Sequence, residues 1–322
     1  MIAESDLARS AEVRRLAADA IAHEAAADFA AAQVLAERAT SVAAPLADTE
    51  DDGLMSLWVD IEVVCARLLA TLGAFGSAEA RLAAALAVAS RVLANDHQSV
   101  LSIHNVRGIA AKYAGRFDEA EAHYERIRAI LEAGLDTDAD ALAGVLHNLG
   151  GLDHSRGRVA EGLLHAERGQ RLRIEAVGPD HPDVARDLNA IGALHHDAGN
   201  TTAADAAYRR AMGIFERTLG ADHFEVAMTC ANLAVSTASV GDAVEARRLY
   251  ERALRILVSS LGAGHPEVAL VQHNFAVLLA DRGDPDAALE LLARADTVYA
   301  ATLPHDHPRR LDLLATVRRL RA

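Results

Sequence analysis

Residues 232–254, with the sequence NLAVSTASVGDAVEARRLYERAL, carry the pattern that decides the fold of this chain. Its central glycine, Gly241, has a small residue seven positions before it, Ala234, and another five positions after it, Ala246. A large apolar residue, Tyr250, lies nine positions after the glycine. The pattern recurs with substitutions every 42 residues, centred on Gly73, Gly115, Gly157, Gly199, Gly241 and Gly283. A fixed period of this length indicates tandem structural repeats.

Each repeat is predicted to form two antiparallel helices joined at the central glycine. Glycine adopts the left-handed conformation that ends many helices without the steric cost of a Cβ atom. Small residues on both sides of the turn allow the two helices to pack closely. They form two columns, Ala66, Gly108, Gly150, Gly192, Ala234 and Ala276 before the glycine and Ala78, Ala120, Gly162, Ala204, Ala246 and Ala288 after it.

A second motif links successive repeats. Residues 178–185 read GPDHPDVA, and the motif returns at residues 220–227 and 262–269, with a shortened form at 305–308. Proline at the first position of a helix suits this motif, because its φ is fixed and the missing N–H is not needed there. Its histidines are expected about 10 Å or more apart, too far to share one metal ion. We therefore predict that they cap helices and pack the linkers: His181, His223, His265 and His307.

The 42-residue pattern resembles the tetratricopeptide repeat in its longer form, that of the kinesin light chain. The resemblance is carried by residues 230–234 (CANLA), 249–254 (LYERAL) and the linker at 261–269, and it covers roughly residues 57–308. It implies an all-α fold, a right-handed superhelical solenoid of antiparallel helix pairs. It does not specify a function, because such repeats serve many unrelated partners. The third repeat departs from the pattern with Ala166, Gly162 and Gly169, and we expect it to be the loosest.

The resemblance divides the chain into three parts. Residues 1–56 are expected to form a degenerate leading repeat and an acidic connection. Residues 57–307 hold six tandem repeats, and residues 308–322 have the phase of a first helix without a second, as expected for a terminal cap.

Composition excludes several classes of protein. The 322 residues are 51% hydrophobic with a net charge of −14, and Lys112 is the only lysine. The apolar content argues against disorder, and the acidic charge argues against a nucleic-acid partner. We expect no signal peptide, no transmembrane helix and a cytoplasmic location, with Cys65 and Cys230 as inert core thiols. Heavy use of alanine and arginine is typical of a GC-rich bacterial genome.

The sequence contains no motif that predicts catalysis. A phosphate-binding Gly-rich loop, a Gly-x-Ser-x-Gly elbow and a His-Glu-x-x-His helix are all absent from it. No cofactor is therefore expected.

The resemblance implies that the first helix of each repeat lines a concave groove. The stripe facing the groove is polar in most repeats, whereas the fifth repeat supplies only the small or apolar stripe Met228, Ala231, Val235, Ala238 and Ser239. The sixth repeat adds His273 and Asp281. The candidate ligand-binding residues are Asn105, Lys112, Tyr113, His147, His154, Arg186, Asn189, His196 and His273.

Two roles are open for Asn105 and Asn189. Asparagine offers both a donor and an acceptor, which suits the backbone of an extended peptide, and it suits a hydrogen bond to a neighbouring repeat equally well. Asn148, Asn232 and Asn274, one position later, are candidates for such inter-repeat bonds.

Lys112, His154 and His196 share one position in three adjacent repeats. They form either a cationic row for a carboxylate or phosphate group or a solvated helix face. His154, His196 and Asp197 are a weak metal candidate, because ligands from separate helices would have to converge. Tyr124, Tyr208 and Tyr250 are predicted to pack between helices.

The leading functional hypothesis is a non-catalytic scaffold that binds a peptide or protein segment in the groove. Asn105 and Asn189 would hold its backbone, and Lys112, Arg186 and the histidines would hold acidic side chains. One alternative is an enzyme, or its accessory subunit, with a metal or small ligand near His154 and His196. Another is a structural protein that assembles with copies of itself.

Overall fold

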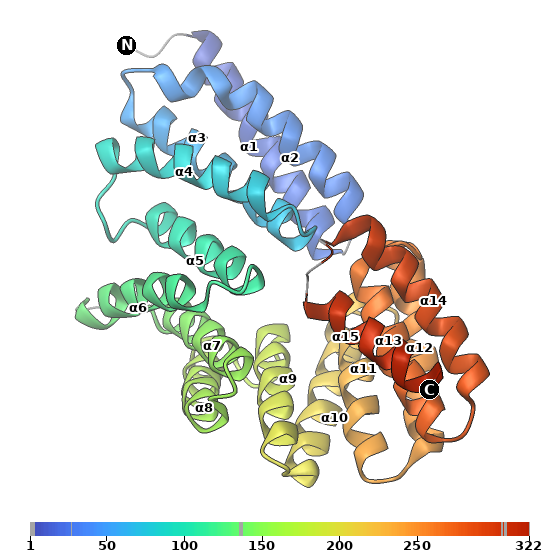
Figure 1. The fold of residues 1–322 in the computed structure, drawn as a ribbon. Coiled ribbons are helices and arrows are strands. Elements are labelled where there is room, and N and C mark those ends of the chain that lie inside the picture. Colours follow the sequence, from blue (N-terminus) through green and yellow to red (C-terminus); the bar gives the residue numbers. More distant parts are fainter. Residues whose placement is uncertain (1–3, 27, 135–137, 304, 306–307, 322) are drawn as a thin grey trace. The chain divides into compact units, whose positions relative to one another are not determined.

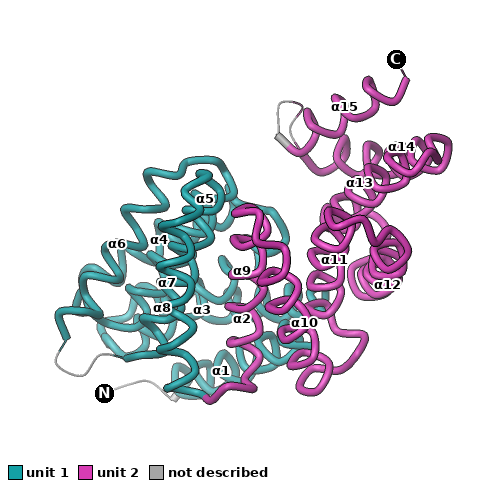
Figure 2. Tube along the Cα trace, turned by 90° about the horizontal axis from the view of Figure 1, so that it is seen from below, with its two compact units in different colours: residues 1–177 teal, residues 178–322 magenta. Residues whose placement is uncertain are grey.

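The computed structural model of the chain is entirely helical in its regular structure over the residues it describes, which are 4–26, 28–134, 138–303, 305 and 308–321 (Figure 1). Fifteen α-helices and one short 3-10 helix occur there, and none of these residues lies in a strand. The predicted all-α class is confirmed. The helices gather into two compact units, unit 1 (Met1–Val177) and unit 2 (Gly178–Ala322), which Figure 2 distinguishes by colour.

Successive helices pair as antiparallel hairpins in both units. Unit 1 contains α1 (Glu4–Ala25), α2 (Phe29–Ala43), the 3-10 helix η1 (Ala44–Asp48), α3 (Asp52–Thr71), α4 (Phe75–Val92), α5 (Gln98–Tyr113), α6 (Phe117–Ala133), α7 (Ala139–Ser155) and α8 (Val159–Val177). Unit 2 contains α9 (Pro182–Asp197), α10 (Thr201–Thr218), α11 (Phe224–Ser239), α12 (Ala243–Leu261), α13 (Pro266–Asp281), α14 (Pro285–Thr302) and α15 (Pro308–Arg321). The division at 57 and 308 that the sequence suggests stays a proposal.

The glycines that define the repeat occupy the turn inside each hairpin from α3/α4 onward. All six have a left-handed backbone, with φ between 72° and 94°. The prediction of a left-handed C-cap at these positions is therefore confirmed. A side chain there would be strained by the backbone conformation alone.

The histidines of the linker motif are helix caps, as predicted. Nδ1 of His181, His223 and His265 accepts a hydrogen bond from the backbone N–H two residues later, at 3.1–3.2 Å. His97 caps α5 in the same way, with Nδ1 3.2 Å from the nitrogen of Ser99. His307 lies outside the described residues.

The core between the paired helices depends on the small-residue columns. The second column is fully buried at Ala78, Ala120, Ala204, Ala246 and Ala288. In the first column, Gly108 and Gly192 lie against the buried rings of Tyr124 and Tyr208. Tyr250 is buried too and stacks on Phe275, with ring centroids 5.2 Å apart. The three tyrosines pack between helices, as predicted.

The expectation that the third repeat is the loosest is wrong. Its glycines let α7 and α8 approach closely, because a Cβ atom on Gly150 would lie 3.1 Å from the carbonyl oxygen of Gly162. A Cβ atom on Gly169 would likewise lie 3.1 Å from the carbonyl oxygen of Ala143. With Ala166 in place of a large side chain, the helices pack backbone against backbone rather than around a ring.

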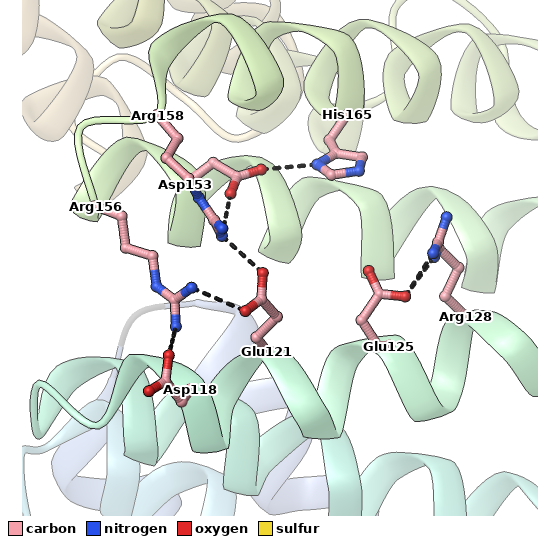
Figure 3. A network of polar contacts seen from close by, with 8 residues as sticks. All are labelled: Asp118, Glu121, Glu125, Arg128, Asp153, Arg156, Arg158 and His165. Carbon is pink, nitrogen blue, oxygen red and sulfur yellow. Dashed lines mark hydrogen bonds and ion pairs between the residues drawn. The ribbon is translucent and has the colours of Figure 1, made fainter.

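An ion-pair network fastens this hairpin to α6 (Figure 3). The buried Asp153 of α7 lies 2.6 Å from Arg158 and 2.8 Å from Nδ1 of His165. Arg158 also pairs with Glu121 of α6 at 2.7 Å. Arg156 pairs with Glu121 at 2.8 Å and with the exposed Asp118 at 2.5 Å. The network runs from a buried carboxylate to the surface.

Replacing Asp153 with alanine is expected to lower the free energy of unfolding by about 2 kcal/mol, because it removes a buried carboxylate together with its contacts to Arg158 and His165. The control is Asp118→Ala at the exposed end of the same network, where an ion pair contributes less than about 1 kcal/mol. Urea denaturation followed by circular dichroism measures both. Equal effects of the two substitutions would contradict a stabilising role for the buried end.

Candidate functional site

The residues predicted to bind a ligand lie on the first helix of their hairpins. Asn105, Lys112 and Tyr113 belong to α5 and His147 and His154 to α7, all in unit 1, whereas Arg186, Asn189 and His196 of α9 and His273 of α13 belong to unit 2. The cationic row of Lys112, His154 and His196 is thus divided between the two units and stays a prediction.

The two asparagines proposed to read a peptide backbone bond to the next repeat. Oδ1 of Asn105 accepts a hydrogen bond from Nδ2 of Asn148 at 2.7 Å. Oδ1 of Asn189 accepts one from Nδ2 of Asn232 at 3.3 Å. Each bond, which we call a rung, joins residues 43 positions apart. Of the two roles left open, the inter-repeat bond is the one that the structure contains.

His273 makes a third rung with the same spacing. Its Nε2 lies 3.1 Å from Oγ1 of Thr316 on α15, and only 5% of the histidine is exposed. Arg309 of α15 also pairs with Glu267 of α13 at 3.0 Å. The terminal helix α15 therefore packs on α13 as the first helix of one more repeat would. This packing covers His273, so we remove it from the ligand-binding set.

Arg186 is neutralised by its own unit. Its guanidinium pairs with Glu225 of α11 at 2.6 Å and with Asp183 of α9. An acidic ligand would have to compete with two carboxylates for this arginine. The expected role of Arg186 in holding acidic side chains thus has no support from its contacts.

Lys112 is a half-buried cation on unit 1. Its Nζ lies against α7, where a Cβ atom on Gly151 would be only 2.9 Å away, and burial lowers the pKa of the amine. The same nitrogen is 5.8 Å from the ring centroid of Tyr113. Tyr113 is 54% exposed and stacks on Phe75, with centroids 5.6 Å apart. An aromatic face and an ammonium group are therefore adjacent at this edge of α5.

A cavity of about 430 Å³ opens on unit 2 between α11, α12 and α13. Its walls come from the small and apolar stripe of the fifth repeat and from the facing part of the sixth. The lining residues are Val235, Ala238, Ser239, Tyr250, Asn274, Val277, Leu278, Asp281 and Arg282. The predicted stripe includes four of them, Val235, Ala238, Ser239 and Asp281.

The sequence pattern missed Asn274 as a cavity residue. Asn274 occupies the position that donates in the first two rungs, but the residue 43 positions before it is Ala231. Within the described part of the chain, Asn274 makes no side-chain hydrogen bond. The missing asparagine at 231 was the signal that could have identified it.

The described ranges contain no group of three or more His, Cys, Asp or Glu side chains that could hold a metal ion. His154 lies in unit 1 and His196 and Asp197 in unit 2, so the weak metal candidate spans both units. Cys65 and Cys230 are free and buried, in agreement with their predicted role as core thiols. No helix in the residues covered by the structure is long and apolar enough to cross a membrane.

Solved structures with a similar fold come from several repeat proteins. A Rap protein complexed with competence and sporulation factor is 16% identical, with a TM-score of 0.68 and coverage of 90% of this chain and 77% of that one. The Rap conjugation gene regulator of plasmid pLS20, complexed with the Phr* peptide, is 14% identical, with a TM-score of 0.70 and coverage of 88% and 72%. A putative kinesin light chain from Podosopora anserina with TPR-like repeats is 21% identical, with a TM-score of 0.51 and coverage of 65% and 98%. At these identities the likeness concerns the fold alone.

Comparison with curated proteins finds no match. The family model for the tetratricopeptide repeat matches residues 65–133, 141–217, 188–257 and 225–300, which together span most of the chain. These matches agree with the repeat that the glycines mark out. The chain belongs to the tetratricopeptide repeat family.

Proposed function

We propose that this protein is a non-catalytic module that binds an extended peptide or a protein segment. The observation that carries the proposal is the cavity of unit 2, whose walls include the groove-facing positions of the fifth and sixth repeats. It is a depression open to solvent on one side, and its volume of about 430 Å³ and its apolar walls with a few polar groups can receive one side chain and the adjacent backbone of a bound segment. Two neighbours in fold were solved with a bound factor or peptide, which supports the same use here.

The cellular setting is part of the proposal. Two free, buried cysteines suit a reducing compartment, and heavy use of alanine and arginine is typical of a GC-rich bacterial genome, so we propose the cytoplasm of a bacterium.

A selection experiment tests the proposal. A phage-displayed library of random twelve-residue peptides is selected on the full-length protein and on Ala238→Arg, which places a large charged side chain in the cavity. We expect the selected peptides to bind Ala238→Arg at least about tenfold more weakly than wild type, a loss of roughly 1.4 kcal/mol.

The matched control is Val244→Arg. It places the same side chain on α12 of the same unit, at a position that is 75% exposed and outside the cavity lining. This variant should bind as wild type does. Equal binding to wild type and Ala238→Arg, or no peptide enriched on wild type, would overturn the proposal.

A further inference from the structure

The cavity of unit 2 lies between two repeats that lack the inter-repeat hydrogen bond, or rung, found on either side of them in this unit. Unit 2 has one rung before this place, Asn189 with Asn232, and one after it, His273 with Thr316. Between them the pair of positions is Ala231 and Asn274, and the methyl side chain of alanine can neither donate nor accept. The rung is therefore absent between α11 and α13, and Asn274 lines the cavity instead.

The amide of Asn274 is left with both of its hydrogen-bonding groups unused by the described residues. Its side chain is half-buried and its amide atoms are not among the buried polar atoms that lack a partner, so water can satisfy them in the free protein and a ligand can replace that water. A side-chain amide donates and accepts at once, which matches the N–H and C=O of an extended backbone.

The walls beside Asn274 are apolar. Val235 and Ala238 of α11, Val277 and Leu278 of α13 and the ring of Tyr250 surround the space. A large aliphatic or aromatic side chain would remove this surface from water, at about 25 cal/mol for each Å² buried. The cavity is thus suited to one apolar anchor of a bound segment.

Two charged residues of opposite sign lie at the rim, and they differ in their contacts. The guanidinium of Arg282 donates from Nη2 to the carbonyl oxygen of Gly241 at 3.2 Å, which holds it at the α11–α12 turn. The carboxylate of Asp281 is exposed and has no hydrogen bond or ion pair within the residues that the structure describes. Arg282 keeps its positive charge, because a backbone carbonyl oxygen does not neutralise it, but Asp281 is the rim charge without a partner among the described residues and can pair with a cationic group of a ligand.

We propose that the cavity of unit 2 is a specific subsite for a basic, apolar-anchored peptide segment. One large apolar side chain fills the space, the amide of Asn274 bonds the adjacent backbone, and Asp281 pairs with a neighbouring arginine or lysine. This inference rests on the proposed peptide-binding function and adds the chemistry of the ligand. The ligand proposed here is basic, whereas the sequence suggested an acidic one. Two residues expected to bind acidic groups are not available for it, because Arg186 already pairs with Glu225 and His273 is buried.

The first test uses the displayed library of random twelve-residue peptides on full-length protein with Asp281→Lys. Peptides selected on wild type should carry arginine or lysine within two positions of an apolar anchor, at least about threefold above the unselected library. Peptides selected on Asp281→Lys should carry aspartate or glutamate there, because the substitution reverses the charge at the rim. The same preference on both proteins, or anchors that are not apolar, would overturn the inference and leave peptide binding itself intact.

The second test restores the missing rung. In Ala231→Asn, the new asparagine side chain can accept a hydrogen bond from Asn274, just as Asn189 accepts one from Asn232. The amide of Asn274 would then be bonded within the protein and no longer available to the ligand. We expect the peptides selected on wild type to bind this variant at least about fivefold more weakly, with thermal stability unchanged or raised.

The control for the second test is Asn232→Ala, which opens the rung to Asn189 outside the cavity lining and should leave peptide affinity within a factor of two. Unchanged affinity in a folded Ala231→Asn variant would overturn the role of Asn274. If no peptide is enriched on wild type at all, the proposed function fails together with the inference.

Discussion

Gly108→Ala is expected to destabilise unit 1 by about 2–3 kcal/mol, although alanine is the better helix former. A Cβ atom at this position would lie less than 3.0 Å from three atoms of the Tyr124 ring, closer than real Cβ contacts. Tyr124 is fully buried, so its ring cannot move into solvent to make room. The steric strain therefore outweighs the gain of up to about 1 kcal/mol in helix propensity. Urea denaturation followed by circular dichroism measures the change.

The chain supplies both a control and a rescue for this substitution. Gly76 lies at the second position of α4 in the same unit, where it is exposed and a Cβ atom would meet nothing within 4 Å, so Gly76→Ala should not destabilise the protein. The double substitution Gly108→Ala with Tyr124→Leu reproduces the residues found at the same two positions of the first repeat, the buried Ala66 and Leu82. It should recover most of the lost stability. If Tyr124→Leu does not restore stability to the Gly108→Ala variant, the clash with the Tyr124 ring is not the cause of the destabilisation.

The fold could be predicted from the sequence because its determinants act locally. A glycine such as Gly241 must take a left-handed φ, and a histidine such as His265 caps the helix that starts beside it. Both effects depend on residues a few positions away, so a period of 42 residues carries them unchanged along the chain. The one structural expectation that failed, a loose third repeat, treated glycine as a lost side chain. At Gly150 and Gly169 the absent Cβ atoms instead permit close helix contact.

The candidate site could be predicted only in part, because its chemistry depends on contacts between repeats. The stripe that the family resemblance assigned to the groove contains Val235 and Ala238, and both line the cavity of unit 2. Phase does not reveal that Glu225 pairs with Arg186 or that α15 covers His273, since each contact joins residues about 40 positions apart. Such a contact depends on the register of one helix against the next and on side-chain rotamers. The structure supplies both.

Acidification from pH 7.5 to 5.0 is expected to lower the free energy of unfolding of unit 1 by about 2 kcal/mol through the buried His104 and its half-buried partner His123. Nδ1 of His104 on α5 lies 3.0 Å from Nδ1 of His123 on α6, so a neutral pair shares one proton between the two nitrogens. Burial, and then the nearby His123, Arg126 and Arg107, lowers the pKa of His104 to about 4. Burial followed by Arg107 also lowers the pKa of His123.

The sign of the effect follows from which state binds more protons. At pH 7.5 and above, both histidines are almost entirely neutral in the folded and the unfolded chain, and their contribution to stability is constant. Below pH 6.5 the unfolded chain binds a proton that folded His104 takes up only near pH 4, so the free energy of unfolding falls through this window. The loss would approach about 3 kcal/mol at pH 4.

The double substitution His104→Leu with His123→Leu isolates this contribution. It replaces both partners with apolar groups, which avoids leaving either nitrogen unsatisfied in the core. Between pH 7.5 and 5.0, the variant should lose about 2 kcal/mol less than wild type in urea denaturation. The exposed His305 provides the control, because His305→Gln should retain the wild-type dependence. A double variant as acid-sensitive as wild type would assign the effect elsewhere, first to the cap His265, whose pKa is lowered by burial and whose Nδ1 must stay unprotonated to accept its bond.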